Sequence, residues 1–323
     1  MRFIPIINLK LLLFFGVLIT ALNSCLKDPS TTPPITVEDA RARIEITDAA
    51  IDDPNIKAVL ITVIDIKVDG KSWAGFDGKS TFDLLSYQNG QTKLMGEGVL
   101  EAGTYQDIVL VLDTETDANG DSPGCYIKDA QGKKRKLDGG SQWSVKTKGS
   151  FITKSNETTE AIIDMDLRKC IIYQSGSDST FRFVTDPELT ESIRLMDKVT
   201  TGSIAGDCTD GLSGSKKVIV YAYKKGAYNS NEKFFQGASQ IQFKNAVTSS
   251  VLAADGTYKL SFLESGNYEL HYISYQEDTQ GKLVAKGELQ LNVLSGSLNL
   301  LQLNLSAKSN INVDVIVTGI IFF

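Results

Sequence analysis

The chain has 323 residues, with 33 basic and 39 acidic side chains and a formal net charge of −6. Nucleic-acid binding relies on lysine and arginine to neutralise phosphates, so this acidic balance argues against a nucleic-acid partner. Removal of the N-terminal segment described next would leave roughly 300 residues, enough for two domains that each bury a core.

The N-terminus predicts a bacterial lipoprotein signal peptide over residues 1–24. Two basic residues precede an apolar run at 11–22, and a small residue follows it, which is the order of a secretory signal. The run has about a dozen residues, whereas a membrane-spanning helix needs roughly 20. Residues 22–25, Leu-Asn-Ser-Cys, resemble the lipobox of bacterial lipoproteins, with Asn23 standing where a small or apolar residue is commoner. The resemblance implies that Cys25 carries acyl chains such as palmitate and anchors the chain in a membrane.

A polar tether follows this cysteine. Residues 25–39 are rich in Pro, Ser and Thr and show no apolar periodicity, which is typical of a solvated linker. Some surface lipoproteins have an acidic cluster directly after the cysteine, and here only Asp28 is present. We expect lipid anchoring in the bacterial outer membrane and leave open whether the folded part faces the cell surface or the periplasm.

Most of the remaining chain predicts β-strands. Apolar residues recur with a period of two in “AVLITVIDIKV” (58–68), “YKLSF” (258–262), “ELQLNVL” (288–294) and “INVDVIV” (311–317). In the first of these, one face would carry Leu60, Ile64, Ile66 and Val68. Turn signals such as “QNG”, “ANGD” and “AADG” separate the runs. The pattern predicts an all-β fold of two antiparallel β-sandwich domains in tandem.

Helical and loop signals are few. “FDLLSY” (82–87) predicts a turn or two of helix, and “DPELTESIRLMDK” (186–198) begins with an Asp cap followed by Pro. The basic run at 133–136 follows “DAQG” and predicts a hairpin tip, with binding of an anionic glycan or lipid headgroup as the alternative. Gly, Ser and Thr dominate residues 198–217, so we place the domain junction just before Thr200, giving domains at 40–198 and 199–323.

Two segments share a phrase, “LEAGTYQDIVL” (100–110) and “LESGNYELHYI” (263–273). In each, a glycine stands two residues before a tyrosine that opens an alternating strand. This pattern predicts a loop that enters a sheet with the tyrosine ring packed near the strand end. We interpret the pair as related sandwich corners and not as a duplication.

Three blocks of the first domain resemble the lipoprotein family known as domain of unknown function 4382. They are “ITDAAIDDPNIKAVLITVIDIKV”, “FDLLSYQNGQTKLMGEGVLEAGTYQDIVLVL” and “AIIDMDLRKCII”, and the resemblance extends from about Ala42 to Pro187. The family is all-β and occurs in secreted or lipid-anchored bacterial proteins, often of Bacteroidota. Its activity is not established, so the resemblance implies an architecture and no catalytic residues.

The second domain is similar to prealbumin-like, carboxypeptidase-regulatory-like sandwiches. The similarity lies in “GSIAG” (202–206), “VIVYAY” (218–223) and “DGTYKLSFLESGNYEL” (255–270), and it does not extend to residues 229–248. Such modules usually serve as stalks or scaffolds in cell-surface proteins, and the resemblance implies that role and a Greek-key, transthyretin-like topology here.

Side chains suited to catalysis are scarce. His271 is the only histidine, and it lies on the strand face opposite Leu270 and Tyr272, so we expect it to be exposed. Asp164 and Asp166 share a strand face, as the paired carboxylates of a glycosidase could, but the alternate apolar residues claim the core and send both aspartates to solvent. We assign no catalytic residue and predict a protein that is not an enzyme.

An acidic stretch, “DTETDANGDSPG” (113–124), carries alternating oxygen ligands of the kind that calcium requires. Its register does not fit an EF-hand, because Tyr126 would stand where the bidentate glutamate belongs. We expect a solvated acidic hairpin loop, with calcium as the alternative and no other cofactor. The candidate ligands are Asp113, Glu115, Asp117, Asn119 and Asp121.

Three cysteines remain besides Cys25, and three cannot all pair within one chain. An oxidising envelope permits one disulfide, and Cys125 with Cys170 is the choice within one domain. No Cys-x-x-Cys spacing supports a metal or redox site. Trp73 and Trp143 lie beside glycine-rich loops, where we expect ordinary packing, with stacking on a sugar as the alternative.

These features predict a lipid-anchored envelope protein without enzymatic activity. Our preferred hypothesis is a surface binding or adhesion module that recognises a protein or glycan through loops of the first domain, with the second domain as a spacer. The runner-up is a fimbrial subunit assembled by strand donation after proteolysis, since Arg41 and Arg43 come just before the first expected strand. An envelope enzyme is the third hypothesis, and the lack of a convergent His, Cys or carboxylate cluster argues against it.

Overall fold

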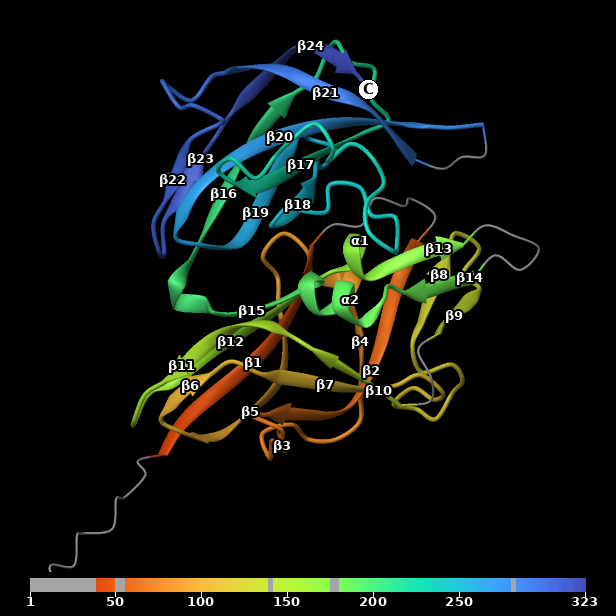
Figure 1. Ribbon diagram of the computed structural model, residues 1–323, viewed down its shortest axis with the longest axis vertical. Coiled ribbons are helices and arrows are strands. Elements are labelled where there is room, and N and C mark those ends of the chain that lie inside the picture. Colours follow the sequence, from red (N-terminus) through yellow and green to blue (C-terminus); the bar gives the residue numbers. More distant parts are fainter. Residues whose placement is uncertain (1–38, 50–55, 139–141, 175–179, 280–282) are drawn as a thin grey trace, which may run out of the picture. The chain divides into compact units, whose positions relative to one another are not determined.

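The structure is built almost entirely from β-strands, which confirms the predicted fold class (Figure 1). The computed structural model describes residues 39–49, 56–138, 142–174, 180–279 and 283–323. The expected signal peptide, Cys25 and nearly all of the tether lie outside these residues. Among the helices of the described part of the chain, none is long and apolar enough to cross a membrane.

Two facing sheets form the first sandwich, residues 39–197. One sheet has the order β5 (Lys93–Glu101), β1 (Asp39–Ala49), β12 (Thr158–Asp166), β15 (Ile193–Asp197), β11 (Lys148–Thr153) and β6 (Gly103–Tyr105). The other has the order β10 (Gln142–Lys146), β7 (Ile108–Asp113), β2 (Ile56–Val68), β8 (Tyr126–Asp129), β9 (Lys134–Asp138), β14 (Thr180–Phe183) and β13 (Ile171–Gln174), with β3 (Lys71–Ser72) and β4 (Ser80–Asp83) also on β2. Apolar residues of both sheets, among them Ile44, Ile163, Ile61 and Leu110, share one core cluster.

The second sandwich, residues 201–322, is formed by one curved sheet. Its order is β18 (Thr248–Val251), β17 (Lys217–Lys224), β20 (Gly266–Glu277), β21 (Leu283–Val293), β24 (Val315–Phe322), β16 (Thr201–Thr209) and β19 (Thr257–Glu264), with β22 (Leu303–Leu305) on β20 and β23 (Asn310–Asn312) on β16. Val313, Val315 and Val317 are buried in one phase, as the alternation predicted. They join Leu260 and Tyr272 in a core separate from that of the first sandwich.

The connection between β17 and β18, residues 225–247, covers the outer face of the second sandwich. Phe243 of this loop stacks on Tyr221 of β17 with ring centroids 4.6 Å apart. Both belong to a third apolar cluster together with Ile219, Ile273 and Tyr275. Strands β17 and β20 are therefore buried on both faces. An alternating pattern predicts burial of one face only, so it does not reveal this second packing layer.

Most strand pairs are antiparallel, as expected, but the sheets are mixed. β1 runs parallel to β12, and β11 runs parallel to β15. Parallel pairs also join β14 to β9 and β16 to both β23 and β24. Strand β1 thus lies inside its sheet, with β12 on one side and antiparallel β5 on the other.

Strand β2 contains a β-bulge that reverses part of the predicted phase. Its pairing with β7 shifts register between Val63 and Asp65. An extra residue in one strand moves the following side chains to the opposite face, so the inward positions change from odd to even numbers. Leu60 and Ile64, which we expected in the core, are therefore only half-buried. The core-facing residues are Val59, Ile61, Val63, Ile66 and Val68.

The helices are short and match the sequence only in part: residues 193–197 of the second predicted segment form strand β15, and Thr185, not Asp186, is the N-cap of its helix. “FDLLSY” contains the 3-10 turn η1 (Leu84–Ser86), and the Pro-started segment forms α2 (Asp186–Ser192). A further helix, α1 (Leu167–Cys170), which was not predicted, directly continues β12. The 3-10 turn η2 (Lys198–Thr200) connects the last strand of the first sandwich to β16.

The phrase shared by the two halves forms a tyrosine corner in each sandwich. The Tyr105 hydroxyl donates to the carbonyl oxygen of Glu101 at 2.8 Å, and the Tyr268 hydroxyl donates to that of Glu264 at 2.7 Å. Each tyrosine thus bonds back to the chain four residues upstream, a device of sandwich corners. The interpretation as related corners is confirmed.

Candidate functional site

The acidic loop after β7 folds around its own carboxylates. Asp113 accepts from the backbone amide of Glu115 at 2.8 Å and from the Lys79 ammonium at 2.8 Å. Burial acts to raise the pKa of Asp113, but these bonds outweigh it and hold the pKa at about 2. Asp117 accepts from the backbone amides of Asn119 and Asp121 at 2.9 and 3.0 Å. The carboxylates of the loop are therefore bonded to backbone amides and to Lys79.

The basic run lies at the predicted hairpin and faces this acidic loop. Strands β8 and β9 pair around a turn in which Gly132 has a φ of +76°. Lys136 contacts Glu115 at 2.7 Å, and Lys134 lies 3.7 Å from Asp117. In the described part of the chain, no group of three or more His, Cys, Asp or Glu residues is placed to hold a metal ion. The described residues thus offer no group of ligands for calcium.

The expected disulfide between Cys125 and Cys170 is not formed. Both cysteines are free and buried, as is Cys208. The Cys125 thiol lies 3.4 Å from the carbonyl oxygen of Asp113, while Cys170 lies 3.9 Å from that of Ser192. Each sulfur is thus engaged in a different part of the first sandwich, and burial raises the pKa of the Cys125 thiol to about 12. The prediction was wrong because the number of cysteines shows how many could pair, but not which of them lie close together in the fold.

Asp164 and Asp166 are buried, contrary to the solvent exposure that we expected. They leave 3% and 2% of their surface exposed. The alternation of β12 was correct, since Ile163 and Met165 do enter the first core. The opposite face, however, is covered by residues of the second sandwich. Charges on that face must then be paired or hydrogen-bonded to be tolerated.

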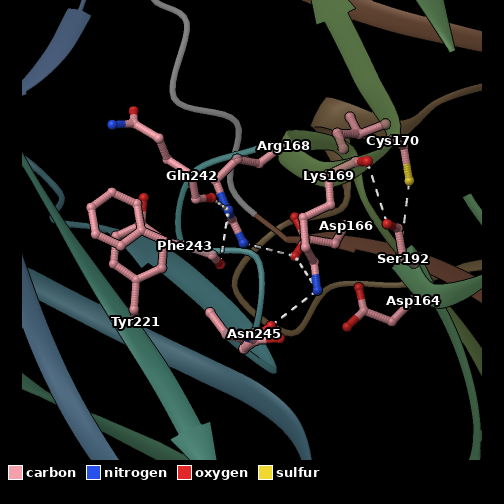
Figure 2. Close-up of polar contacts among 12 residues, drawn as sticks. Asp164, Asp166, Arg168, Lys169, Cys170, Ser192, Tyr221, Gln242, Phe243 and Asn245 are labelled. Carbon is pink, nitrogen blue, oxygen red and sulfur yellow. Dashed lines mark hydrogen bonds and ion pairs between the residues drawn. The ribbon is translucent and has the colours of Figure 1, made fainter. Parts of the chain in front are cut away.

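Two cations of α1 connect the sandwiches at this point (Figure 2). Arg168 lies 3.2 Å from Asp166 and donates to the carbonyl oxygens of Gln242 at 2.7 Å and Phe243 at 3.3 Å. Lys169 lies 3.1 Å from the same carboxylate and donates to the carbonyl oxygen of Ala246 at 3.0 Å. We call Asp166, Arg168 and Lys169 the charged junction. It binds the backbone of the loop that covers the second sandwich.

The surroundings shift the pKa values of two neighbouring aspartates, Asp166 and Asp48, in opposite directions. Burial alone would raise the pKa of Asp166, but the charges of Arg168 and Lys169 lower it below the usual value. Burial raises the pKa of Asp48 well above its usual value, and the nearby charges of Asp164 and Asp166 raise it further against hydrogen bonds from Gln88 and the backbone of Leu167. One carboxylate is thus held ionised and its neighbour is driven toward the neutral form.

Two further side chains of the first sandwich bind the second beside the charged junction. Arg194 of β15 pairs with Asp164 and donates to the carbonyl oxygen of Phe262 at 3.0 Å. Glu188 of α2 accepts from the backbone amide of Ser239 at 3.2 Å and from its hydroxyl. Burial acts to raise the pKa of Glu188, but its hydrogen bonds lower it to about 2.

His271 is also buried, contrary to expectation. Its ring stacks on Tyr228 with centroids 3.6 Å apart, and its Nδ1 lies 2.6 Å from Glu288. Tyr228 belongs to the 225–247 loop, which covers the strand face that we took to be solvated. The cause is the same as for Asp164, because the strand face opposite the core packs against a second layer.

A small polar cleft opens between the two sandwiches. Its outer part, about 170 Å³, is lined by Lys259, Lys308 and hydroxyl and amide side chains such as Ser203 and Asn310. A deeper chamber of about 10 Å³ shares Gly90, Lys259, Ser261 and Phe262 with the outer part and reaches Asp48 and Asp164.

The charged junction and the cleft were not predicted from sequence. A signal was present, because Arg168 and Lys169 follow Asp166 inside an apolar run, and charges in such a setting are usually paired. Their partners could not have been identified, since they are backbone carbonyls of residues 242–246, a region without recognisable motifs. Trp73 and Trp143 are packed residues, with indole nitrogens bonded to Val99 and Asp186.

Comparison with known proteins extends these observations. Three solved structures show low similarity to this chain, and TM-scores this low carry no argument about fold or function. The Bacillus anthracis TIE protein is 12% identical with a TM-score of 0.20 and covers 86% of this chain, which spans 34% of that protein. BcpA, the major pilin subunit of Bacillus cereus, is 10% identical with a TM-score of 0.20, over 86% of this chain and 70% of its own. The fimbrial anchor protein Mfa2 from Porphyromonas gingivalis is 13% identical with a TM-score of 0.19, over 87% and 97%.

Sequence comparison identifies only the first sandwich. No curated protein matches the chain. Residues 39–182 match the family model described as domain of unknown function (DUF4382), in agreement with the resemblance found in the sequence blocks.

Proposed function

We propose that this protein is a lipid-anchored envelope component that acts as a binding or adhesion module on a rigid β-sandwich scaffold. The observation that carries the proposal is the charged junction. Arg168 and Lys169 use buried, charge-assisted bonds to hold the backbone of the second sandwich. Such bonds fix the orientation of two sandwiches, and a fixed orientation suits display of a surface more than a catalytic cycle that opens and closes.

Residues that could have supported chemistry have structural partners, which favours a role without catalysis. Asp164 is paired with Arg194, Asp166 with the two cations of α1, and His271 with Glu288. Activity in an envelope hydrolase assay that disappears in both His271→Gln and Asp164→Asn would overturn this part of the proposal.

Chain order changes one detail of the initial hypothesis. The tether precedes β1, so lipid at Cys25 would attach directly to the first sandwich. The second sandwich follows it in the chain and is not a spacer in the covalent path to the membrane. We therefore assign display of the binding surface to the joined pair of sandwiches.

Anchoring and display are tested together in cells that produce the protein. Metabolic labelling with an alkyne fatty acid should label the wild-type chain and not Cys25→Ser. Treatment of intact cells with an impermeant protease should then digest the labelled protein. Labelling that persists in Cys25→Ser would contradict lipidation at this residue, and protection from the protease would contradict surface adhesion and place the scaffold in the periplasm.

A fimbrial subunit remains the second candidate because of the position of β1. Residues Arg41 and Arg43 lie within this strand and not before it, and Arg43 contacts Glu97 at 2.9 Å. Loss of a strand flanked by β5 and β12 would expose two strand edges that a donated strand could fill. Oligomer ladders that resist heat in detergent would support assembly, and a monomer band alone from native envelopes would exclude it.

A further inference from the structure

We infer that the cleft between the two sandwiches is a binding site for an acidic monosaccharide, either free or at the end of a glycan. This inference deepens the proposed binding role and rests on it for its biological meaning. It is carried by a chemical contrast between the two ends of the cleft.

The deep end of the cleft offers hydrogen-bond acceptors that have no partner. Oδ1 of Asp164 and the hydroxyl oxygen of Ser249 are buried without a hydrogen bond in the described protein, and both residues line the 10 Å³ chamber. Asp164 is 97% buried and Ser249 is 95% buried, as their exposures of 3% and 5% indicate. The other carboxylate oxygen of Asp164 is held by Arg194. A ligand hydroxyl that donates to Oδ1 would relieve the cost of an unsatisfied buried acceptor.

The outer end of the cleft is positive. Lys259 and Lys308 both line the 170 Å³ space, and no acidic residue lines it. Both lysines are exposed, so a carboxylate can approach them without the cost of burying a cation. The outer end, lined by two lysines, therefore suits an anionic group, while the deep end, where Lys259 lies with Asp48 and Asp164, suits a hydroxyl donor.

Polar groups along the outer part of the cleft favour a sugar over a small amino acid. Thr201, Ser203, Ser261 and Asn310 line the outer cleft, and the Ser261 hydroxyl has no hydrogen-bond partner. Alanine has only its carboxylate and ammonium groups to meet these side chains, whereas a hexuronate has a hydroxyl on most ring carbons. The volume is below the roughly 300–1,000 Å³ of sites for drug-sized ligands, which limits the occupant to about one sugar ring.

Both sandwiches contribute to the cleft, so the site exists only when they are joined. Gly90 comes from the first sandwich, where its φ is +85°, and a side chain there would approach the Ser261 hydroxyl to 2.7 Å. The glycine allows the loop tip at residues 87–92 to approach β19 without filling the shared wall of the cleft. The charged junction thus has a consequence for recognition, because it keeps the two halves of the site together.

Isothermal titration calorimetry on the purified protein tests the inference with galacturonate as the probe. We expect a dissociation constant on the order of 1 mM or tighter at low salt. Galactose, which lacks the carboxylate, should bind at least tenfold more weakly. Alanine, which has a carboxylate and an ammonium donor, distinguishes an amino-acid site. Binding of alanine without galacturonate would overturn the sugar assignment, and no heat from any probe would mean that the chamber holds water only.

Substitutions then locate the site. Lys259→Gln and Lys308→Gln should each weaken galacturonate binding roughly two- to fivefold, as for exposed ion pairs. Ser249→Ala removes only an unpartnered oxygen, so it should weaken binding by a similar factor without loss of folding. Lys71→Gln, an exposed lysine of β3 outside the cleft, is the matched control and should leave affinity unchanged. Equal effects at Lys71 and Lys259 would contradict the site. All of these results are independent of lipidation, so failure here leaves the anchoring proposal intact.

Discussion

The protein has two clusters in which acidic and basic side chains form ion pairs, and the clusters differ in how far they are exposed to solvent. At the hairpin, Lys136 and Glu115 meet with 41% and 51% of their side chains exposed. At the charged junction, Arg168 and Asp166 meet with 2% and 3% exposed. Water can solvate the charges of the first pair when that pair is broken. The charges of the second pair are shielded from water, so their only partners are groups of the protein. The same ionic chemistry therefore contributes little to stability in one place and joins two sandwiches in the other.

Removal of Arg168 should have the largest effect. In Arg168→Ala the backbone carbonyls of Gln242 and Phe243 lose a donor, and Asp166 loses one of its two cations. Breaking a buried pair costs about 3–5 kcal/mol, measurable from urea unfolding. Arg135→Ala is the matched control, since Arg135 pairs with Asp129 at the exposed hairpin and should lose about 1 kcal/mol or less. Equal losses in the two variants would refute the distinction between the clusters.

Glu188→Gln should have the next largest effect and should depend on pH. The substitution removes the charge that accepts from Ser239, and a hydrogen bond to a charged group contributes about 1.5–3 kcal/mol. Because the folded pKa of Glu188 is lowered to about 2, its contribution is present above the unfolded value of 4.5 and is lost as pH falls toward 2. The difference in unfolding free energy between wild type and variant should therefore be full at pH 7 and shrink below pH 4.5. A constant difference from pH 7 to pH 2.5 would show that the charge is not responsible.

Removal of the tyrosine hydroxyl in either corner should cost less stability than the substitutions above. Tyr268 is fully buried, and its hydroxyl also accepts from Lys224 at 2.7 Å, while Tyr105 is half-buried. Loss of a buried hydrogen bond costs about 0.5–1.5 kcal/mol, so Tyr268→Phe should fall at the upper end of this range and Tyr105→Phe at the lower end. Thermal unfolding monitored by circular dichroism would measure both, and the reverse order would contradict the account of burial.

The smallest effect is expected at the exposed hairpin. Lys136→Gln removes a surface ion pair with Glu115 and should cost about 0–1 kcal/mol in dilute buffer. Added salt should erase the difference, because it screens exposed charges. The measurement is the urea midpoint at low and at high salt. A loss that persists at high salt would show that Lys136 contributes through packing.

Sequence patterns predicted the strands and corners well, because alternation and turn residues are local properties. They did not predict the charged junction, because alternation tells which face of β12 meets its own core and not what covers the other face. Asp164 and His271 were both assigned to solvent for this reason. The β2 bulge had a different cause, since one unpaired residue shifts the phase without changing composition. The free Cys125 and Cys170 show that separation in space is not encoded in spacing along the chain.

We expect the charged junction to make the two sandwiches one cooperative unit, and urea unfolding followed by two signals would show whether it does. Both tryptophans, Trp73 and Trp143, lie in the first sandwich, so their fluorescence reports that sandwich alone. Far-ultraviolet circular dichroism reports the strands of both. We predict that the two curves coincide in a single transition at neutral pH. A circular dichroism curve with a second transition that tryptophan fluorescence does not show would contradict the claim.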